Sequence, residues 1–183
     1  MRITILNGNP DAGNTDFDRY IRSLAEGLTG KSHEVKSHTL REMQIRYCVS
    51  CWNCWFKTPG ICRFEDSMPV IYKSVVAADL VIFASPVIMG FTSALLKRAN
   101  ERLIPLLLPH IDLVRGENHH RARYGHEAAW GLVLKKNSDT DDEDIRIISD
   151  IYRRETLNFK SSLKFTFLTD KPVKEACDAI DAL

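Results

Sequence analysis

Four of the five cysteines in this chain are crowded into one short stretch. Two residues separate the first cysteine from the second and the second from the third, and seven separate the third from the fourth. Thiolates two residues apart on a tight loop converge on one point, which is what an iron–sulfur cluster or a zinc ion requires of its protein ligands. The spacing therefore predicts a metal-binding loop at about residues 47–66. Its candidate ligands are Cys48, Cys51, Cys54 and Cys62.

Other uses of these cysteines stay open at this stage. Disulfides are disfavoured, because the chain starts on an apolar run with no secretory leader and a reducing cytoplasm is the expected setting. Four thiolates would also satisfy the tetrahedral geometry of zinc, although zinc sites more often combine two separated Cys-x-x-Cys pairs. The spacing alone does not exclude a loop that binds nothing. Cys177, beside Ala176 near the end of the chain, is expected to be a small buried apolar residue.

Length and charge limit the classes of protein and partner. A chain of 183 residues suits a single domain over residues 1–183. Its 25 basic and 24 acidic residues leave a net charge of +1, which gives no general attraction to nucleic acid or to an acidic membrane. The longest apolar candidate for a membrane span is interrupted by Pro105 and Pro109. We therefore expect a cytoplasmic protein with neither a nucleic-acid nor a membrane partner.

Short β-branched runs alternate with stretches of helical periodicity along the chain. Five strands separated by helices call for a parallel sheet covered on both faces, because parallel neighbours need crossover connections. Strands are predicted at residues 2–6, 34–39, 79–84, 128–134 and 161–168. Helices are predicted at residues 17–28, 68–78 and 141–154, and from a cap at Thr92 or Ser93 to residue 103.

Ligands of such sheets bind beyond the carboxyl ends of the strands. The loop at residues 7–15 offers backbone N–H groups and the side chains of Asn9, Asn14 and Thr15 to an anion, although an ordinary strand-to-helix turn uses the same residue types. The loop at residues 85–91 is apolar and partly aromatic, which suits a flat hydrophobic ligand or a partner subunit. Gly90 would allow the backbone to approach such a ligand closely.

Taken together, these motifs resemble the flavodoxin-like NAD(P)H-dependent FMN reductases, and more narrowly their iron–sulfur flavoprotein branch. The resemblance is strong over roughly the first 108 residues and extends to the rest only as a fold pattern. The motifs that carry it are Asn7-Gly-Asn-Pro10 with Gly13-Asn-Thr15, the cysteine run to Trp55 with Thr58-Pro-Gly60, Cys62 and Asp66-Ser-Met68, and Ser85-Pro-Val87 with Gly90.

The resemblance implies a three-layer, doubly wound, five-stranded parallel sheet of order 2-1-3-4-5 that binds FMN. The residues that it would place around the FMN phosphate are Asn9, Pro10, Gly13, Asn14 and Thr15. Those that it would place along the isoalloxazine are Pro86, Val87, Ile88, Met89 and Gly90. Cys48, Cys51, Cys54 and Cys62 occupy the positions that hold a [4Fe–4S] cluster near the flavin in that branch.

The activity implied is that of an oxidoreductase that passes electrons through FMN, with or without the cluster. NAD(P)H is the expected electron donor. A small molecule or a protein is expected as the other electron donor or acceptor. The chain would form a homodimer or a homotetramer. An NAD(P)H-dependent FMN or quinone reductase without a cluster is the nearest alternative. An electron carrier without turnover and a zinc-stabilised binding domain are further alternatives.

Two positions depart from the family pattern. Asp11 stands where the family often has a basic residue, and the loop at residues 135–139 lacks the family's glycines, which leaves Lys135 as its one candidate flavin contact. Elsewhere, Trp52 and Trp55 are expected at a subunit interface. The basic segment around His119 and His120 is expected to be a solvated loop rather than a site for the phosphate of a nicotinamide cofactor.

Overall fold

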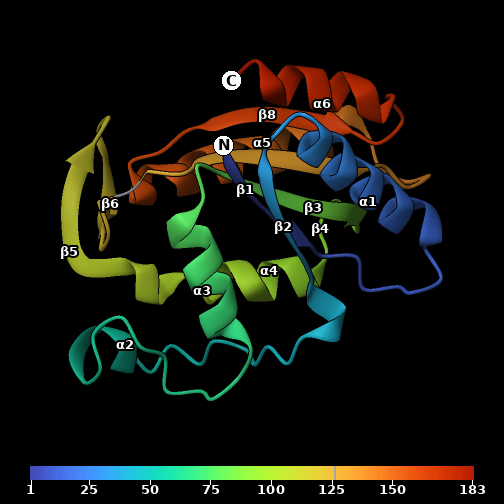
Figure 1. Ribbon diagram of the computed structural model, residues 1–183. Coiled ribbons are helices and arrows are strands. Elements are labelled where there is room, and N and C mark those ends of the chain that lie inside the picture. Colours follow the sequence, from blue (N-terminus) through green and yellow to red (C-terminus); the bar gives the residue numbers. More distant parts are fainter. Residues whose placement is uncertain (126) are drawn as a thin grey trace.

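The computed structural model describes residues 1–125 and 127–183 and shows helices packed on both faces of a central sheet (Figure 1). The strand order is β2-β1-β3-β7-β8, and all four neighbouring pairs are parallel. This confirms the flavodoxin-like order 2-1-3-4-5. The five strands are β1 (Arg2–Asn7), β2 (Glu34–Thr39), β3 (Leu80–Ile88), β7 (Ala129–Lys135) and β8 (Leu163–Leu168).

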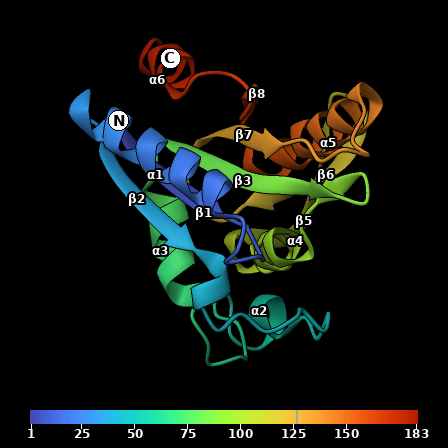
Figure 2. The same ribbon diagram turned by 90° about the vertical axis from the view of Figure 1, so that its right-hand side faces the viewer.

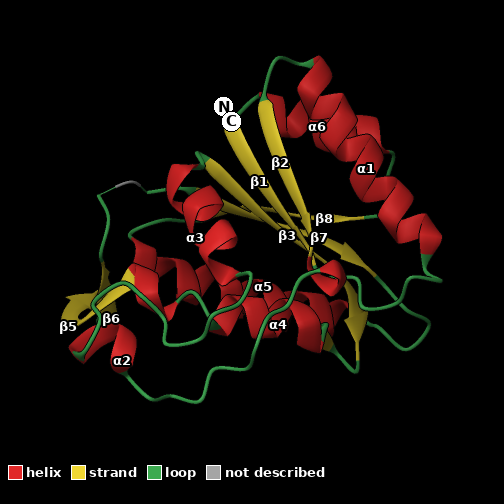
Figure 3. Cartoon of the chain, turned by 60° about the horizontal axis from the view of Figure 1, so that its bottom comes forward, coloured by secondary structure: helices red, strands yellow, loops and turns green. Residues whose placement is uncertain are grey.

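Two apolar clusters, one on each face, hold the layers together. Successive side chains of a strand point to opposite faces. Ile82 of β3 therefore belongs to one of the two clusters and Phe83 to the other. One face carries α1 (Thr15–Gly30) and α6 (Val173–Asp181), and the other carries α3 (Met68–Ala77), α4 (Ala94–Glu101) and α5 (Asp142–Glu155) (Figure 3). Cys177 lies on the buried face of α6 and is a small buried residue, as expected, although that helix was not predicted.

The prediction of a loop at residues 85–91, after the third strand, is wrong in part. β3 continues to Ile88 and turns back into β4 (Phe91–Thr92), so that Ile88 pairs with Phe91. Met89 and Gly90 form the two-residue turn with φ values of 51° and 74°. Such turns need positive φ at both central residues because their twist then matches that of the strands. Glycine at the second position is therefore required by the backbone as well as by any ligand.

The predicted solvated loop around the two histidines is also wrong. These residues lie in β6 (Glu117–Ala122), which pairs antiparallel with β5 (Leu107–Val114). The turn between them has positive φ at Arg115 and Gly116. His119 is buried and contacts Glu117, and the hairpin stands beside the main sheet as a separate arm (Figure 1). Its polar sequence resembles a loop because most of its surface faces solvent.

The cysteine-rich segment runs below α3 and α4 and has little regular structure (Figure 2). Its only α-helix is the single turn α2 (Asn53–Phe56), and three short 3₁₀ turns lie elsewhere, η1 (Leu40–Glu42), η2 (Ile104–Leu106) and η3 (Thr156–Phe159). Ser93 caps α4 by accepting the N–H of Leu96, as one of the two expected caps. Among the described residues, no helix is long and apolar enough to cross a membrane.

Candidate functional site

The loop between β1 and α1 is held in shape by a partly buried acidic side chain. Oδ1 of Asp18 accepts the side-chain N–H groups of Asn7 at 2.8 Å and of Asn9 at 3.1 Å. Arg41 completes the set with two contacts to the same carboxylate, at 2.8 and 3.1 Å. Although burial opposes its charge, the hydrogen bonds from Asn7, Arg41 and Asn9 hold the pKa of Asp18 below its usual value. Asn9, predicted as a phosphate contact, is fully buried and its amide is used within the loop.

This loop also lies tightly against the start of α4. A Cβ atom on Gly8 would come within 2.5 Å of the Leu96 side chain. The carbonyl of Gly8 accepts the hydroxyl of Ser93 at 2.5 Å, and the N–H of Ser93 is itself bound by Ser85 Oγ. The loops after β1 and β3 are therefore locked to one another through α4.

The amino end of α1 presents one favourable and one unfavourable charge to an anion. Lys135 Nζ donates to Asn14 Oδ1 at 2.8 Å, which places a positive charge beside the start of the helix. Asn14 makes no side-chain cap of its own on α1. On the other side, Asp11 accepts the N–H of Gly13 at 2.8 Å, so its carboxylate occupies one of the backbone donors that an anion would use. Asp11 thus points into the loop.

An open groove of about 390 Å³ joins these loops at the carboxyl edge of the sheet. It brings together residues predicted for the phosphate and for the flavin ring, and adds Asn137, which sequence reasoning missed. Asn137 donates to the carbonyl of Val87 at 2.6 Å and so ties the loop after β7 to the end of β3. The lining residues are Asn9, Pro10, Asp11, Asn14, Pro86, Ile88, Lys135 and Asn137.

Several of the residues predicted to contact FMN do not line the groove. Val87 is fully buried in the core, whereas Met89 is 91% exposed at the tip of the turn. A Cβ atom on Gly90 would lie 2.8 Å from the Asp144 carboxylate at the start of α5, so close packing also favours glycine there. Thr15 begins α1 behind the loop.

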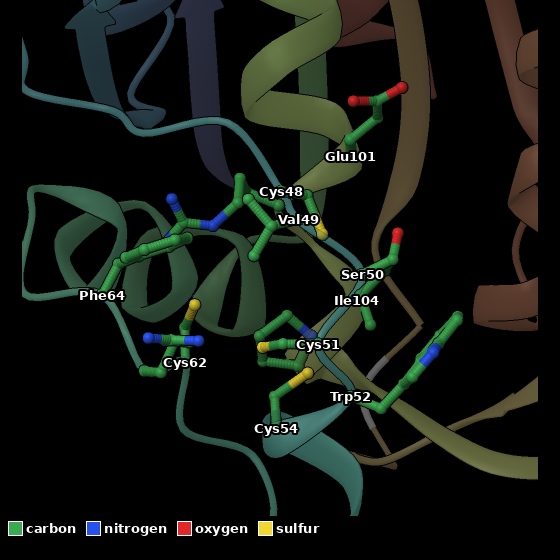
Figure 4. A pocket seen from close by; sticks show the side chains of 13 residues that line it. Cys48, Val49, Ser50, Cys51, Trp52, Cys54, Cys62, Phe64, Glu101 and Ile104 are labelled. Carbon is green, nitrogen blue, oxygen red and sulfur yellow. The ribbon is translucent and has the colours of Figure 1, made fainter.

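The four clustered cysteines all face a second pocket, at the carboxyl end of α4 (Figure 4). Every one of them is a free thiol, with Cys51 exposed and the other three partly buried. Ser50 and Trp52, on either side of Cys51, have positive φ values of 48° and 59°. Non-glycine residues adopt this conformation at a cost of about 1 to 3 kcal/mol each, and such strain often marks functional sites. The backbone is thus bent sharply at the residue that presents Cys51.

The electrostatics of this pocket disfavour thiolates unless a cationic group lies among the sulfurs. Burial raises the pKa of Cys54, and the neighbouring Cys62, Cys48 and Cys51 raise it further, so the four thiols are close enough to repel one another once ionised. Arg102 lines the same pocket, and its partner Asp66 lies 2.7 Å away. The donor set therefore fits a group that neutralises several thiolates at once.

The cysteines do not form a ready-made site for a single metal ion. In the described part of the chain, no three ligand side chains are gathered closely enough to hold one. At a Zn–S distance of about 2.3 Å, tetrahedral thiolates would lie only about 4 Å apart. A [4Fe–4S] cluster binds each cysteine at a different iron and so requires a wider set.

The two tryptophans differ in their surroundings. Trp55 donates its Nε1–H to the carbonyl of Ile104 at 3.2 Å, and its ring lies 4.7 Å from that of His120 and 4.8 Å from that of Trp52. Contacts within the chain therefore account for Trp55. Trp52 is 43% exposed. The predicted subunit interface stays a prediction for both tryptophans.

The groove and the cysteine pocket lie at opposite ends of α4. The start of the helix, at Ser93, contacts the loop of the groove, while Glu101 and Arg102 at its end line the cysteine pocket. Eight helical residues span about 12 Å. Within one chain the two sites are thus a helix length apart, rather than in contact.

Comparison with known proteins agrees with the geometry. An iron–sulfur flavoprotein of Methanocaldococcus jannaschii is 28% identical over 116 residues, which cover 63% of this chain and 57% of that protein. An iron–sulfur flavoprotein of Methanosarcina thermophila is 29% identical over 106 residues, 58% of this chain and 54% of that protein. The chain thus spans a little over half the length of these curated relatives.

Solved structures share the fold at low sequence identity. The NAD(P)H:quinone oxidoreductase from Methanothermobacter marburgensis superposes with a TM-score of 0.60 at 15% identity, over 99% of this chain and 93% of that one. The sequence profile of the NADPH-dependent FMN reductase family matches residues 1–126. This chain therefore belongs to the NADPH-dependent FMN reductase family, as its motifs led us to expect, and the iron–sulfur flavoproteins are among its relatives.

Proposed function

We propose that this chain is an FMN-binding oxidoreductase that holds the flavin in the groove at the carboxyl edge of the sheet. The observation that carries the proposal is that one groove combines the loop at the start of α1, the apolar end of β3 and a lysine. Anions bind well at helix starts, and flat apolar rings bind against apolar walls. Bound FMN would supply the redox chemistry, and the protein would supply its position and electrostatics.

The residues of the groove divide this task. Lys135 and the backbone N–H groups of the loop between Pro10 and Asn14 would hold the phosphate. Pro86 and Ile88 would lie along the isoalloxazine, and Met89, at the exposed tip, would cover its outer edge. Asp11 would weaken phosphate binding through its negative charge.

We further propose that Cys48, Cys51, Cys54 and Cys62 hold a [4Fe–4S] cluster. The shared pocket, the strained turn at Cys51 and the iron–sulfur flavoproteins among the relatives of this chain support it. NAD(P)H or a protein carrier would be the electron donor, and a small molecule or another protein the acceptor. Because a helix length separates the two sites in one chain, a homodimer or homotetramer would offer additional routes between them.

A reductase without a cluster is the second candidate, in which NAD(P)H reduces FMN directly for a quinone. The observation that favours it is that the groove is complete without any contribution from the cysteine pocket. Replacing Cys51 and Cys54 by serine separates the two candidates. Unchanged turnover of NADPH with a quinone would favour this second candidate, whereas a loss of electron transfer with FMN still bound would favour the cluster.

The proposed flavin groove is tested by FMN titration of the Lys135→Met variant. Loss of the one cation that reaches Asn14 should weaken FMN binding about tenfold, which corresponds to about 1.4 kcal/mol. Lys136→Met is the matched control, because Lys136 pairs with the exposed Asp142 and does not line the groove. Equal FMN affinities of the two variants, or no FMN binding by the unmodified protein, would refute the assignment.

A further inference from the structure

Arg102 is a fully charged side chain buried in the wall of the cysteine pocket. It follows α4 directly as its C-cap residue. Its side chain and that of Asp66 are each only 1% exposed, and they pair at 2.7 Å. Asp66 is in turn fixed by the backbone N–H groups of Arg46 and Met68, at 3.1 Å each. The guanidinium is therefore held in one orientation by a buried and rigid partner.

The hydrogen bonds of this guanidinium leave one of its three nitrogens without a hydrogen-bond partner. Nη1 donates to the carbonyl of Arg46 and to Asp66, and Nη2 donates to Asp66 at 3.3 Å. Nε is shielded from solvent and has no partner among the described residues. The hydroxyl of Tyr72 is also buried without a partner there, close enough to Arg102 to interact with it but outside hydrogen-bond geometry. Buried unsatisfied polar groups are uncommon in proteins, and two side by side need an explanation.

Cys62 and Arg102 line the same pocket, which offers an explanation. Both Arg102 and Tyr72 lie close enough to Cys62 for a negative charge on its sulfur to act on them. Arg102, rather than Asp66, is the member of the ion pair that lines the cysteine pocket. Burial of a charge costs several kcal/mol even when it is paired. An anionic sulfur centre in this pocket would be stabilised by the positive charge of Arg102 and could accept its free N–H.

We propose that Arg102 is a positioning residue for the group held by the four cysteines, and that its fixed positive charge and free N–H beside Cys62 raise the reduction potential of that group. The inference rests on the proposed iron–sulfur site. Potentials of such clusters depend on net charge and on hydrogen bonds to sulfur. A nearby positive charge stabilises the reduced, more negative form. Arginine suits the task better than lysine, since its fork binds Asp66 with two nitrogens and leaves the third free.

The test compares variants of the whole chain, reconstituted anaerobically with iron and sulfide. Arg102→Gln removes the charge and the N–H, while Arg102→Lys keeps the charge. Arg98→Gln is the matched control, because Arg98 lies one turn earlier on α4, stacks on Tyr47 at 4.0 Å and does not line the pocket. Iron and sulfide per chain are measured first, and the midpoint potential is then measured by redox titration followed by electron paramagnetic resonance.

The proposal predicts that Arg102→Gln lowers the ratio of reduced to oxidised cluster at a given potential about tenfold, which is about 59 mV for one electron. Arg102→Lys should fall between this variant and the unmodified protein, and Arg98→Gln should match the latter. If Arg102→Gln does not fold, the double variant Asp66→Asn/Arg102→Gln replaces it, because it leaves no unpaired buried charge. Its shift should have the same direction, since Arg102 is the nearer of the two charges to the pocket.

Two results would overturn the proposal, and they are distinguishable. A variant without Arg102 that keeps full iron and sulfide and has the potential of Arg98→Gln would assign Arg102 a purely structural role. Absence of iron and sulfide from the reconstituted, unmodified protein would remove the proposed cluster itself, and the iron assay would reveal this before any potential is measured.

Discussion

Replacing Asp18 by alanine should be among the most damaging single changes near the groove. Its carboxylate is 13% exposed and accepts hydrogen bonds from Asn7, Asn9 and Arg41. Removing one partner of a buried charge pair typically costs about 3 to 5 kcal/mol, because the other charge is left unpaired. Arg41 is 21% exposed and can partly turn to water, which places the expected loss of unfolding free energy at about 3 kcal/mol.

Urea denaturation of the Asp18→Ala variant measures this loss, with Asp16→Ala as its control. Asp16 lies in the same first turn of α1, but it is 76% exposed and its partner Arg19 is 70% exposed. Such surface pairs contribute between about 0 and 1 kcal/mol, so Asp16→Ala should leave the midpoint almost unchanged. A loss of less than about 1 kcal/mol for Asp18→Ala would refute the reasoning that this carboxylate organises the loop.

The difference in unfolding free energy between the unmodified protein and Asp18→Ala should depend on pH. Hydrogen bonds hold the folded-state pKa of Asp18 below its usual value, so its contribution is complete above the unfolded-state pKa of about 3.9. That contribution is lost as the pH falls through the lower, folded-state pKa. The difference in unfolding free energy between the unmodified protein and Asp18→Ala should therefore be constant from pH 7 to about pH 5 and shrink below pH 4. A difference that instead grew on acidification would contradict the assigned direction.

Two further predictions concern the sheet and the groove. Gly131→Ala should lower the unfolding free energy by about 1 to 3 kcal/mol, because the new Cβ would lie 2.1 Å from the Phe165 ring. Its control, Gly30→Ala, should not be destabilising, because no atom lies within 4 Å of that position. Equal urea midpoints for the two variants would contradict the tight contact at Gly131. Asp11→Ser should tighten FMN binding about fivefold, because it removes a repulsion of about 1 kcal/mol between this carboxylate and the phosphate. Glu34→Ser, at the far end of the sheet, is the control. Unchanged affinity of Asp11→Ser in a fluorescence titration would show that this carboxylate does not face the phosphate.

The central sheet could be predicted because its signal is local. Strands buried on both faces, such as Leu80–Ile88, consist of continuous apolar runs, and the helices between them show a clear apolar period. The hairpin at 107–122 was missed because it stands outside the core, where polar residues alternate without penalty. Its one local signal was Arg115-Gly116, a pair able to form the tight turn with positive φ. The helix α6 was missed because it spans only nine residues, although its buried residues share one face.

The site was predictable in part for the same reason. The cysteine spacing and the loop after β1 are contiguous in sequence, and each lies in a pocket or groove of the structure. Arg102 and Asn137 were missed because their roles come from contacts with residues far along the chain, Asp66 and Val87. No local pattern distinguishes an arginine that is buried beside a thiol from one in solvent. The inward direction of Asp11 likewise became clear only from its bond to Gly13.

The most direct test of the central claim is an absorption spectrum of the anaerobically purified protein, with iron, acid-labile sulfide and zinc determined on the same sample. The account predicts two flavin bands over a broad shoulder that dithionite bleaches, with about four irons and four sulfides per chain. Flavin without iron or sulfide would contradict the cluster and leave the simpler reductase. Zinc without flavin would contradict the redox function altogether.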